Sequence, residues 1–388
     1  VRALIQEECT AIHPSVEWKF LEQGYNIIHS RNNGKKETIG NIVFKDVYPL
    51  YGMSDIRNSS GERSLAIQHD LNENLNEVQK VLDAILEYKK MPILDEINLR
   101  VREERNKISG GLDSGDESAV LNFLKHEVEP LFTHFEKNDE VLRPILQRYR
   151  KKLDSELGVI YAKRKDFEQS LTQINETISG YLEKVEQQAQ EIFPHYFEKY
   201  KTDGVEYNIY IGQSMVKDRV FHDIYLKNLR LWQLLTMCEI GVRVDKLKGQ
   251  LPKPLDITQL ILVHGEPLSI KFRQDEKHFD VDGAYNIRYE IVKKRIDKAY
   301  IKNTKERLTQ PGKISIVYTQ QREAEEYKKY IDYLQSINYL TENVEYFELE
   351  ELQGAQGLKA IRIEIEKNTE SKDFGNDILK DVIEAIEA

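Results

Sequence analysis

The sequence predicts an α+β protein: an N-terminal helical bundle ending in a long heptad-patterned helix, then a mostly antiparallel sheet domain with flanking helices. Over residues 65–192 apolar residues recur every three or four positions, which is the period of an α-helix. Beyond residue 201 apolar residues alternate in short segments bounded by Gly and Pro, which is typical of strands. We therefore expect a helix and strand connector over 1–64, a helical bundle over 65–200 and an α+β sheet domain over 201–388.

Length and composition exclude several classes of protein. The 388 residues suffice for two or three domains, and the initial Val predicts a piece of a longer protein. A formal net charge of -10 argues against nucleic acid as a partner, because phosphate binding needs a basic face. Cys9 and Cys238 form no C-x-x-C motif, which excludes thiolate zinc and favours a reducing, cytoplasmic compartment. No run of 18 apolar residues occurs, so we expect no membrane segment in this piece.

The connector begins with helical patterns on both sides of Pro14, followed by a short strand over 41–48. The stretch KDVYPLYGMSDIRNSSGER, residues 45–63, then combines many charged residues with Pro, Gly, Asn and Ser. Because these residue types favour turns, we interpret the stretch as a connector between the strand and the bundle.

Two interpretations remain for the end of this connector. Ser59 is followed three positions later by Glu62, the pattern of a capping box at the start of a helix. Alternatively, Arg57, Ser59, Ser60 and Arg63 hold a phosphate at the helix N-terminus. A catalytic serine is disfavoured, because the chain has no G-x-S-x-G elbow.

The bundle contains five predicted helices, separated by Pro92, by the Ser-Gly-Gly at 109–111 and by further turns. Their expected ranges are 65–90, 93–108, 116–135, 139–153 and 153–192.

The fifth helix carries a seven-residue repeat with ten apolar residues among twelve seam positions. The seam comprises Leu153, Leu157, Ile160, Arg164, Phe167, Leu171, Ile174, Ile178, Tyr181, Val185, Gln188 and Ile192. Such a repeat is typical of a coiled-coil seam. The helix is either the longest member of an intramolecular bundle or an intermolecular coiled coil that makes a homodimer.

The sheet domain mixes strand and helix patterns. We expect a hairpin between 258–264 and 268–273, joined by a Gly-Glu-Pro turn. The other expected strands cover 205–211, 313–319, 344–349 and 358–366, and the expected helices cover 220–248, 283–303, 322–336 and 378–386.

This order of elements resembles the GAF-type sensory domains of bacterial signalling proteins. The phrases IHPSVEWKF (12–20), DVYPLYGMSDIRNSS (46–60) and DGAYNIRYEIVKKRIDKA (282–299) are also similar to segments of bacterial proteins identified as GAF-domain-containing. The resemblance implies a small-ligand pocket, dimerisation through long helices and transmission of a signal, but no particular ligand. It implies no covalent bilin, and the cofactor stays unknown. An extended ferredoxin-like sheet is the alternative topology.

A second polar cluster gathers Asp275, Glu276, His278, Asp280 and Asp282 within eight positions. Carboxylate oxygens suit hard cations, and D-x-D-G is similar to part of a calcium loop, but the full pattern is absent. We interpret Asp282 as the N-cap of the next helix.

Two functional alternatives exist for this cluster. In the first, Asp280 and Asp282 join Tyr285, Asn286 and Arg288 in a ligand-binding loop at the edge of the sheet. In the second, the acidic cluster 275–282 serves a metal-assisted hydrolase.

That hydrolase would use Asp280, Asp282 and His278, with His264 from the apolar segment LILVHG as a further candidate.

Taken together, the patterns favour a non-enzymatic regulatory or sensory module of a larger cytosolic bacterial signalling protein. It would bind a small ligand or a partner and dimerise through its helices. The alternatives are the metal-assisted hydrolase and a helical scaffold for protein–protein interaction.

Overall fold

The computed structural model describes residues 13–32, 41–275, 277–283, 287–352 and 355–367. The chain is α+β, as predicted, with an open and mostly antiparallel sheet. It divides into two compact units. The sheet unit comprises Val1–Arg57, Gln173–Gln250 and Leu255–Ala388, and the helical unit comprises Asn58–Thr172 and Leu251–Pro254.

The central strand of the sheet unit is β1, Val43–Ile56. It runs antiparallel to β3, Gly204–Ile211, on one side and to β4, Ile257–Val263, on the other. The strand expected over 41–48 is confirmed from Val43 onward, whereas the interpretation of the stretch as a connector was wrong, because β1 continues to Ile56. The sequence misleads here because strand propensity is low for Pro, Gly, Asp and Ser, whereas long-range pairing and burial hold the strand.

Gly52 explains one of these unexpected residues. A Cβ at this position would lie 2.5 Å from the Tyr207 ring and 2.7 Å from Cε of Met237. Only glycine leaves room for the Tyr207 ring to cross β1, so the residue that resembles a turn signal serves close packing inside a strand.

The strand order of the sheet is β2-β3-β1-β4-β7-β9-β8, and only β4 and β7 in this order run parallel. The remaining bounds are β2 Tyr196–Lys201, β7 Lys313–Tyr318, β8 Leu340–Glu348 and β9 Lys359–Ile365.

The hairpin expected between 258–264 and 268–273 is wrong. Strand β5, Leu268–Arg273, pairs instead with β1 and with β6, His278–Asp282. A bulge in β1 between Phe44 and Val47 shifts the register, so the first part of β1 pairs with β5 and the second part with β4.

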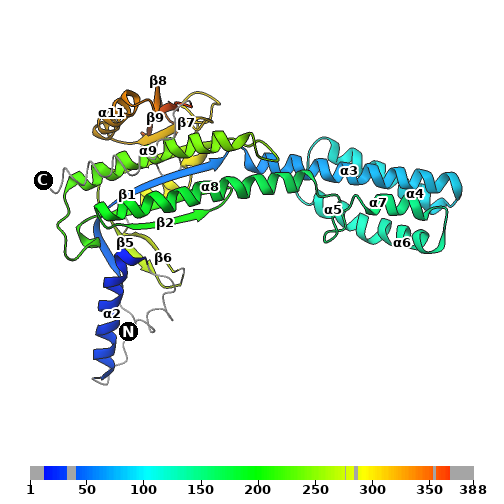
Figure 1. Ribbon diagram of the computed structural model, residues 1–388, viewed down its shortest axis with the longest axis horizontal. Coiled ribbons are helices and arrows are strands. Elements are labelled where there is room, and N and C mark those ends of the chain that lie inside the picture. The colour runs from blue at the N-terminus through cyan, green and yellow to red at the C-terminus, as the bar shows by residue number, and fades with distance from the viewer. Residues whose placement is uncertain (1–12, 33–40, 276, 284–286, 353–354, 368–388) are drawn as a thin grey trace. The chain divides into compact units, whose positions relative to one another are not determined.

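Helices α9, Asp223–Lys248, and α11, Gln321–Ser336, pack against this sheet (Figure 1). An ion pair of 2.8 Å between Arg230 and Glu326 joins the two helices. Helix α11 begins with a capping box in which Gln320 and Glu323 exchange hydrogen bonds with backbone N–H groups.

Helix α2, Pro14–Asn32, belongs to an aromatic cluster with β1, β5 and β6, in which the rings of Phe20 and Phe272 are 4.9 Å apart. Helix α10 is shorter than expected, Ile287–Lys293. The N-cap interpretation of Asp282 was wrong, because this residue ends β6. The helix expected over 378–386 lies outside the described residues.

The helical unit is built from a run of short and long helices around one apolar core (Figure 1). Helices α4 and α7 carry Pro in their first turn, where a backbone N–H has no partner within the helix. The π-helix and α6 continue α5 without a break, so Pro130 lies inside one helical segment. The bounds are α3 Ser59–Tyr88, α4 Pro92–Ser109, α5 Asp116–Phe123, a π-helix Leu124–Val128, α6 Glu129–Asn138, α7 Arg143–Arg150 and α8 Lys163–Ile192.

The capping box expected at Ser59 was wrong. Asn58, in a left-handed conformation with φ 52°, occupies the N-cap of α3 without a side-chain cap hydrogen bond, and Ser59 is the first helical residue. Glu62 forms an ion pair of 2.7 Å with Lys253 instead of capping the helix.

Candidate functional site

The helical unit contains a cavity of about 620 Å³. Its walls come from α3, from the α5–α6 region, from α7 and from the connection between α7 and α8. The apolar part of the lining includes Ile67, Leu71, Leu121, Leu124, Val159 and Ile160. Pockets that bind small organic molecules in proteins have volumes of about 300–1,000 Å³, so this cavity has the size of a ligand site.

One wall of the cavity depends on a buried polar stripe along α3. Asp70, Asn74 and Glu77 are all buried, and their spacing of four and three residues puts them on one face of the helix. The two oxygens of Asp70 accept hydrogen bonds from the backbone N–H groups of Ala162 (3.1 Å), Lys163 (2.9 Å) and Arg164 (2.9 Å). Asp70 therefore caps the N-terminus of α8 from another helix.

The rest of the stripe holds α7 and the residues after it. Tyr149 Oη donates to Oδ1 of Asn74 at 3.4 Å, and Lys152 donates to Glu77 at 2.6 Å. Burial alone would raise the pKa of Glu77, but hydrogen bonds from Lys152 and Lys80 hold the pKa of this carboxyl below its ordinary value. Three polar residues of α3 thus position both ends of the α7–α8 connection.

The connection itself is a tight turn rather than a helix. Oδ1 of Asp154 accepts hydrogen bonds from the N–H groups of Glu156 and Leu157 at 3.0 Å each, and Gly158 has a φ of 68°. The heptad helix expected from residue 153 therefore begins only at Lys163. Side chains of Asp type compete with helix formation by bonding nearby backbone N–H groups, which is the physical reason for this break.

Two arginines add charge to the cavity lining. Arg150 contacts Glu129 and also donates to Glu136 at 2.8 Å. Arg164 lies 2.7 Å from Glu117 and 3.2 Å from Glu168. Each guanidinium is therefore held by two carboxylates.

The residues of the anion site expected at the start of the bundle fall on both sides of the boundary between the two units. Arg57 follows β1 in the sheet unit, where its N–H donates to the carbonyl of Asp256 at 2.8 Å. Ser59, Ser60 and Arg63 belong to the helical unit, with Ser59 buried and Ser60 exposed. The guanidinium of Arg63 lies 5.5 Å from the centre of the Phe167 ring. None of these four residues lines the cavity.

The second expected cluster lies on strand β6 in the sheet unit. His278, Asp280 and Asp282 share one face of this strand, because the alternating residues Phe279 and Val281 are buried on the other. Asp280 lies 3.5 Å from Arg273 on β5. Among the residues that the structure describes, no three His, Cys, Asp or Glu side chains are placed to hold a metal ion.

The remaining residues of this prediction are more scattered. Exposed Arg288 on α10 donates to the carbonyl of Gln356 at 3.3 Å. His264 follows β4, where burial lowers its pKa and its ring lies 5.1 Å from that of Tyr289. Glu276, Tyr285 and Asn286 lie outside the described residues.

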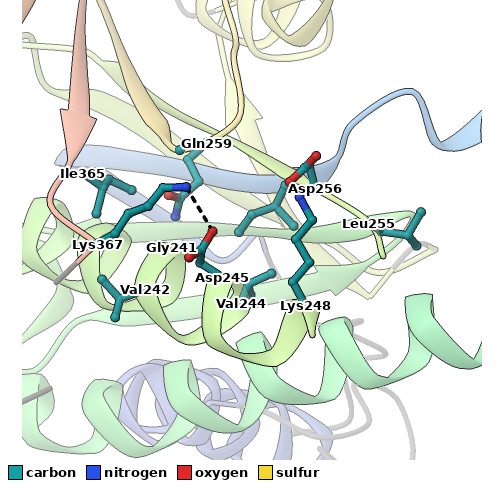
Figure 2. A pocket seen from close by; sticks show the side chains of 12 residues that line it. Gly241, Val242, Val244, Asp245, Lys248, Leu255, Asp256, Gln259, Ile365 and Lys367 are labelled. Atoms are coloured by element: carbon teal, nitrogen blue, oxygen red, sulfur yellow. Dashed lines mark hydrogen bonds and ion pairs between the residues drawn. The ribbon is translucent and has the colours of Figure 1, made fainter. Parts of the chain in front are cut away.

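A smaller pocket of about 30 Å³ lies in the sheet unit beside α9 (Figure 2). Charged side chains at its edge are paired: Lys367 lies 3.3 Å from Asp245 and Lys248 lies 2.5 Å from Asp256. A volume of this size is about that of one water molecule, so the pocket has no room for an organic ligand.

Sequence reasoning missed the residues that build the larger cavity. The signal was present in α3, where Asp70, Asn74 and Glu77 occupy a helical stripe beside the apolar one. A second signal was Arg164, a charged residue at a seam position of the expected heptad helix. In the sequence, both features are indistinguishable from ordinary polar positions on a helix, because their role depends on the packing of the α7–α8 connection against them.

Comparison with known proteins adds little about function. Residues 65–178 match the model of a family described as YeeD uncharacterised protein, which covers less than half of the chain. No curated protein matches. A solved structure, described as the guanylyl cyclase Cya2, is similar over 53% of this chain and 84% of its own, with 11% identity and a TM-score of 0.29. A score this low supports no inference about fold or function. Within the described residues, no helix is both long and apolar enough to cross a membrane.

Proposed function

We propose that this chain is a non-enzymatic regulatory module that binds a small organic ligand in the cavity of its helical unit. The cavity carries the proposal, because it combines a volume of about 620 Å³ with an apolar lining and a few polar groups. This combination is typical of ligand pockets in proteins. The family match over residues 65–178 includes every residue that lines this cavity.

The cavity wall also offers a way to convert binding into a signal. The α7–α8 connection lines the cavity, and Asp70 holds the backbone where this connection enters α8. Helix α8 belongs to the helical unit up to Thr172 and to the sheet unit from Gln173. A ligand that moves the connection would therefore act on the start of the helix that both units share.

The wider setting of this proposal rests on the sequence. The GAF-type resemblance favours a sensory role in a cytoplasmic bacterial signalling protein, and the heptad pattern favours a homodimer. Within this chain alone, Phe167, Ile174 and Ile178 of the heptad seam are already buried, so a dimer would need further contacts. Native mass spectrometry of the full chain would measure the oligomeric mass and any retained organic molecule together.

The test of the ligand site is a thermal-shift screen of the full chain against amino acids, nucleosides, aromatic acids and alkylamines. A ligand that binds only the folded state at 100 times its Kd stabilises it by about 2.7 kcal/mol, which a shift in Tm detects. We expect at least one compound class to raise Tm in the chain, and Leu157→Trp to abolish the shift by filling the cavity from its wall.

Leu99→Trp is the matched control, because Leu99 and Leu157 are both 56% exposed and only Leu157 lines the cavity. Its response to ligands should equal that of the unsubstituted chain. Stabilising compounds that act equally on both variants, or a screen without any stabilising compound, would contradict the proposed function.

A further inference from the structure

We propose that the cavity of the helical unit selects an organic cation, a molecule with an apolar or aromatic body and a protonated amine. This inference rests on the proposed function and names the chemical class of its ligand. It follows from the charge balance of the lining, the partners of the arginines and the tyrosines of the wall.

The charge balance of the cavity is negative. Four carboxylates and three cationic side chains line it, which is an excess of one negative charge. Glu136 and Glu168 lie outside the lining but pair with Arg150 and Arg164, and with these two carboxylates the excess is three negative charges. The lining carboxylates are Asp70, Glu117, Glu129 and Glu156, and the lining cations are Lys125, Arg150 and Arg164. A concave surface with an excess of one sign of charge attracts ligands of the opposite sign.

The arginines do not make the cavity an anion site. Each lies against two carboxylates, which offset the charge of its guanidinium and would repel an anionic ligand that approached its remaining N–H groups. The glutamates, in contrast, retain acceptor capacity. Within the described residues, donors contact only Oε1 of Glu117 and only Oε1 of Glu129, which leaves Oε2 of each to accept from a ligand.

Aromatic residues complete the selection. Tyr149 and Tyr161 both line the cavity, and the guanidinium of Arg164 already lies 5.8 Å from the centre of the Tyr161 ring. The wall therefore already contains one contact between a cation and an aromatic ring, that of Arg164 with Tyr161. An ammonium group is attracted to the face of a tyrosine ring, and this attraction is stronger where water is excluded. The apolar leucine and isoleucine side chains would cover the body of the same molecule.

The experiment uses three probes with one body and different head groups: 4-phenylbutylamine, 4-phenylbutyrate and 4-phenylbutanol. Their binding to the full chain is measured by isothermal titration calorimetry at pH 7 and 50 mM salt. We expect the amine to bind at least tenfold more tightly than the alcohol, and the carboxylate to bind most weakly. The double variant Glu117→Gln with Glu129→Gln should weaken amine binding at least tenfold and leave alcohol binding unchanged.

Glu127→Gln is the matched control. Glu127 forms the same kind of ion pair, with Arg100, and is 39% exposed, against 35% for Glu117 and 37% for Glu129, but it does not line the cavity. Its amine affinity should equal that of the unsubstituted chain. Circular dichroism and Tm show whether each variant is folded, and the comparison of the three probes on the unsubstituted chain decides the point without any variant.

Other outcomes separate this inference from the proposed function. If the alcohol or the carboxylate binds as tightly as the amine and Leu157→Trp abolishes the binding, the cavity is a ligand site and the cation inference fails. If none of the three probes binds, the inference also fails, and the thermal-shift screen decides the proposed function separately. Amine binding that the double variant leaves unchanged overturns the role given to Glu117 and Glu129.

Discussion

Removal of the Asp70 carboxylate should loosen the N-terminus of α8 and with it one wall of the cavity. In the folded chain this buried side chain accepts three backbone N–H groups, from Ala162, Lys163 and Arg164, at 2.9–3.1 Å. Loss of an N-cap side chain costs about 0.5–2 kcal/mol, and an anion at a helix N-terminus adds about 0.3–1 kcal/mol. Because Asp70 satisfies three donors at once, we expect Asp70→Ala to destabilise the helical unit by about 2–3 kcal/mol.

Asp70→Asn gives a finer test. Its amide oxygen retains part of the hydrogen bonding but not the charge, so we expect a loss of about 1–2 kcal/mol. Asp83→Asn is the matched control on the same helix. Asp83 is exposed and accepts one hydrogen bond, from Asn98 at 2.8 Å, which an asparagine oxygen can keep. This variant should stay within about 0.5 kcal/mol of the unsubstituted chain.

The assay is hydrogen exchange of the amides at 162–164, together with urea unfolding of the full chain. Two units need not unfold in one transition, so the local exchange rates carry the quantitative comparison. A loss of 2–3 kcal/mol corresponds to amide exchange that is about 30- to 150-fold faster in Asp70→Ala. Unchanged protection of these three amides in Asp70→Ala would refute the capping role.

Two further predictions concern the sheet unit. Gly52→Ala should destabilise it by about 1–3 kcal/mol, because the added Cβ would overlap the Tyr207 ring. The control is Gly180→Ala, which adds a Cβ in open space on helix α8 and should stabilise the chain by up to about 1 kcal/mol. In urea unfolding, the midpoints of the two variants should therefore move in opposite directions. Burial lowers the pKa of His195 to about 4, whereas an unperturbed histidine in the unfolded chain has a pKa of about 6.5. Between these two pKa values the unfolded state binds a proton at this residue and the folded state does not, so the free energy of unfolding decreases as the pH falls. We expect a loss of about 2 kcal/mol between pH 7 and 4.5 that His195→Gln removes, and an unaltered pH profile in this variant would contradict the assignment.

Much of the helical unit could be predicted from the sequence. The apolar period of α3, the Pro92 punctuation before α4 and the turn at 109–111 are local signals, and the structure confirms the helices near these positions. The strands β7, β8 and β9 were also found, because each is a short alternating or apolar segment between turns. Local periodicity suffices wherever an element buries the face that its own residues define.

The candidate site could not be predicted in this way. Asp70 and Arg164 are 94 positions apart in the chain, and their contact exists only because α3 and the start of α8 pack together. The sequence suggested sites instead at dense polar clusters, near Ser59 and Asp280, where many charged residues are neighbours in the chain. On β6 the side chains of His278, Asp280 and Asp282 do share one face, but no metal-holding group forms there among the described residues, so a dense cluster does not by itself make a site.

By itself, the sequence determined the α+β class, the helical character of the first half and the heptad period of α8, since these depend on residue types at short spacing. Only the tertiary structure decided that residues 45–56 form the central strand and that β5 pairs with β1 and β6. It also decided that the heptad helix begins at Lys163 and that a cavity lies behind Asp70. The physical reason is that strand pairing, glycine close packing and capping from another helix are long-range contacts, which override local propensity where burial and hydrogen bonding favour them.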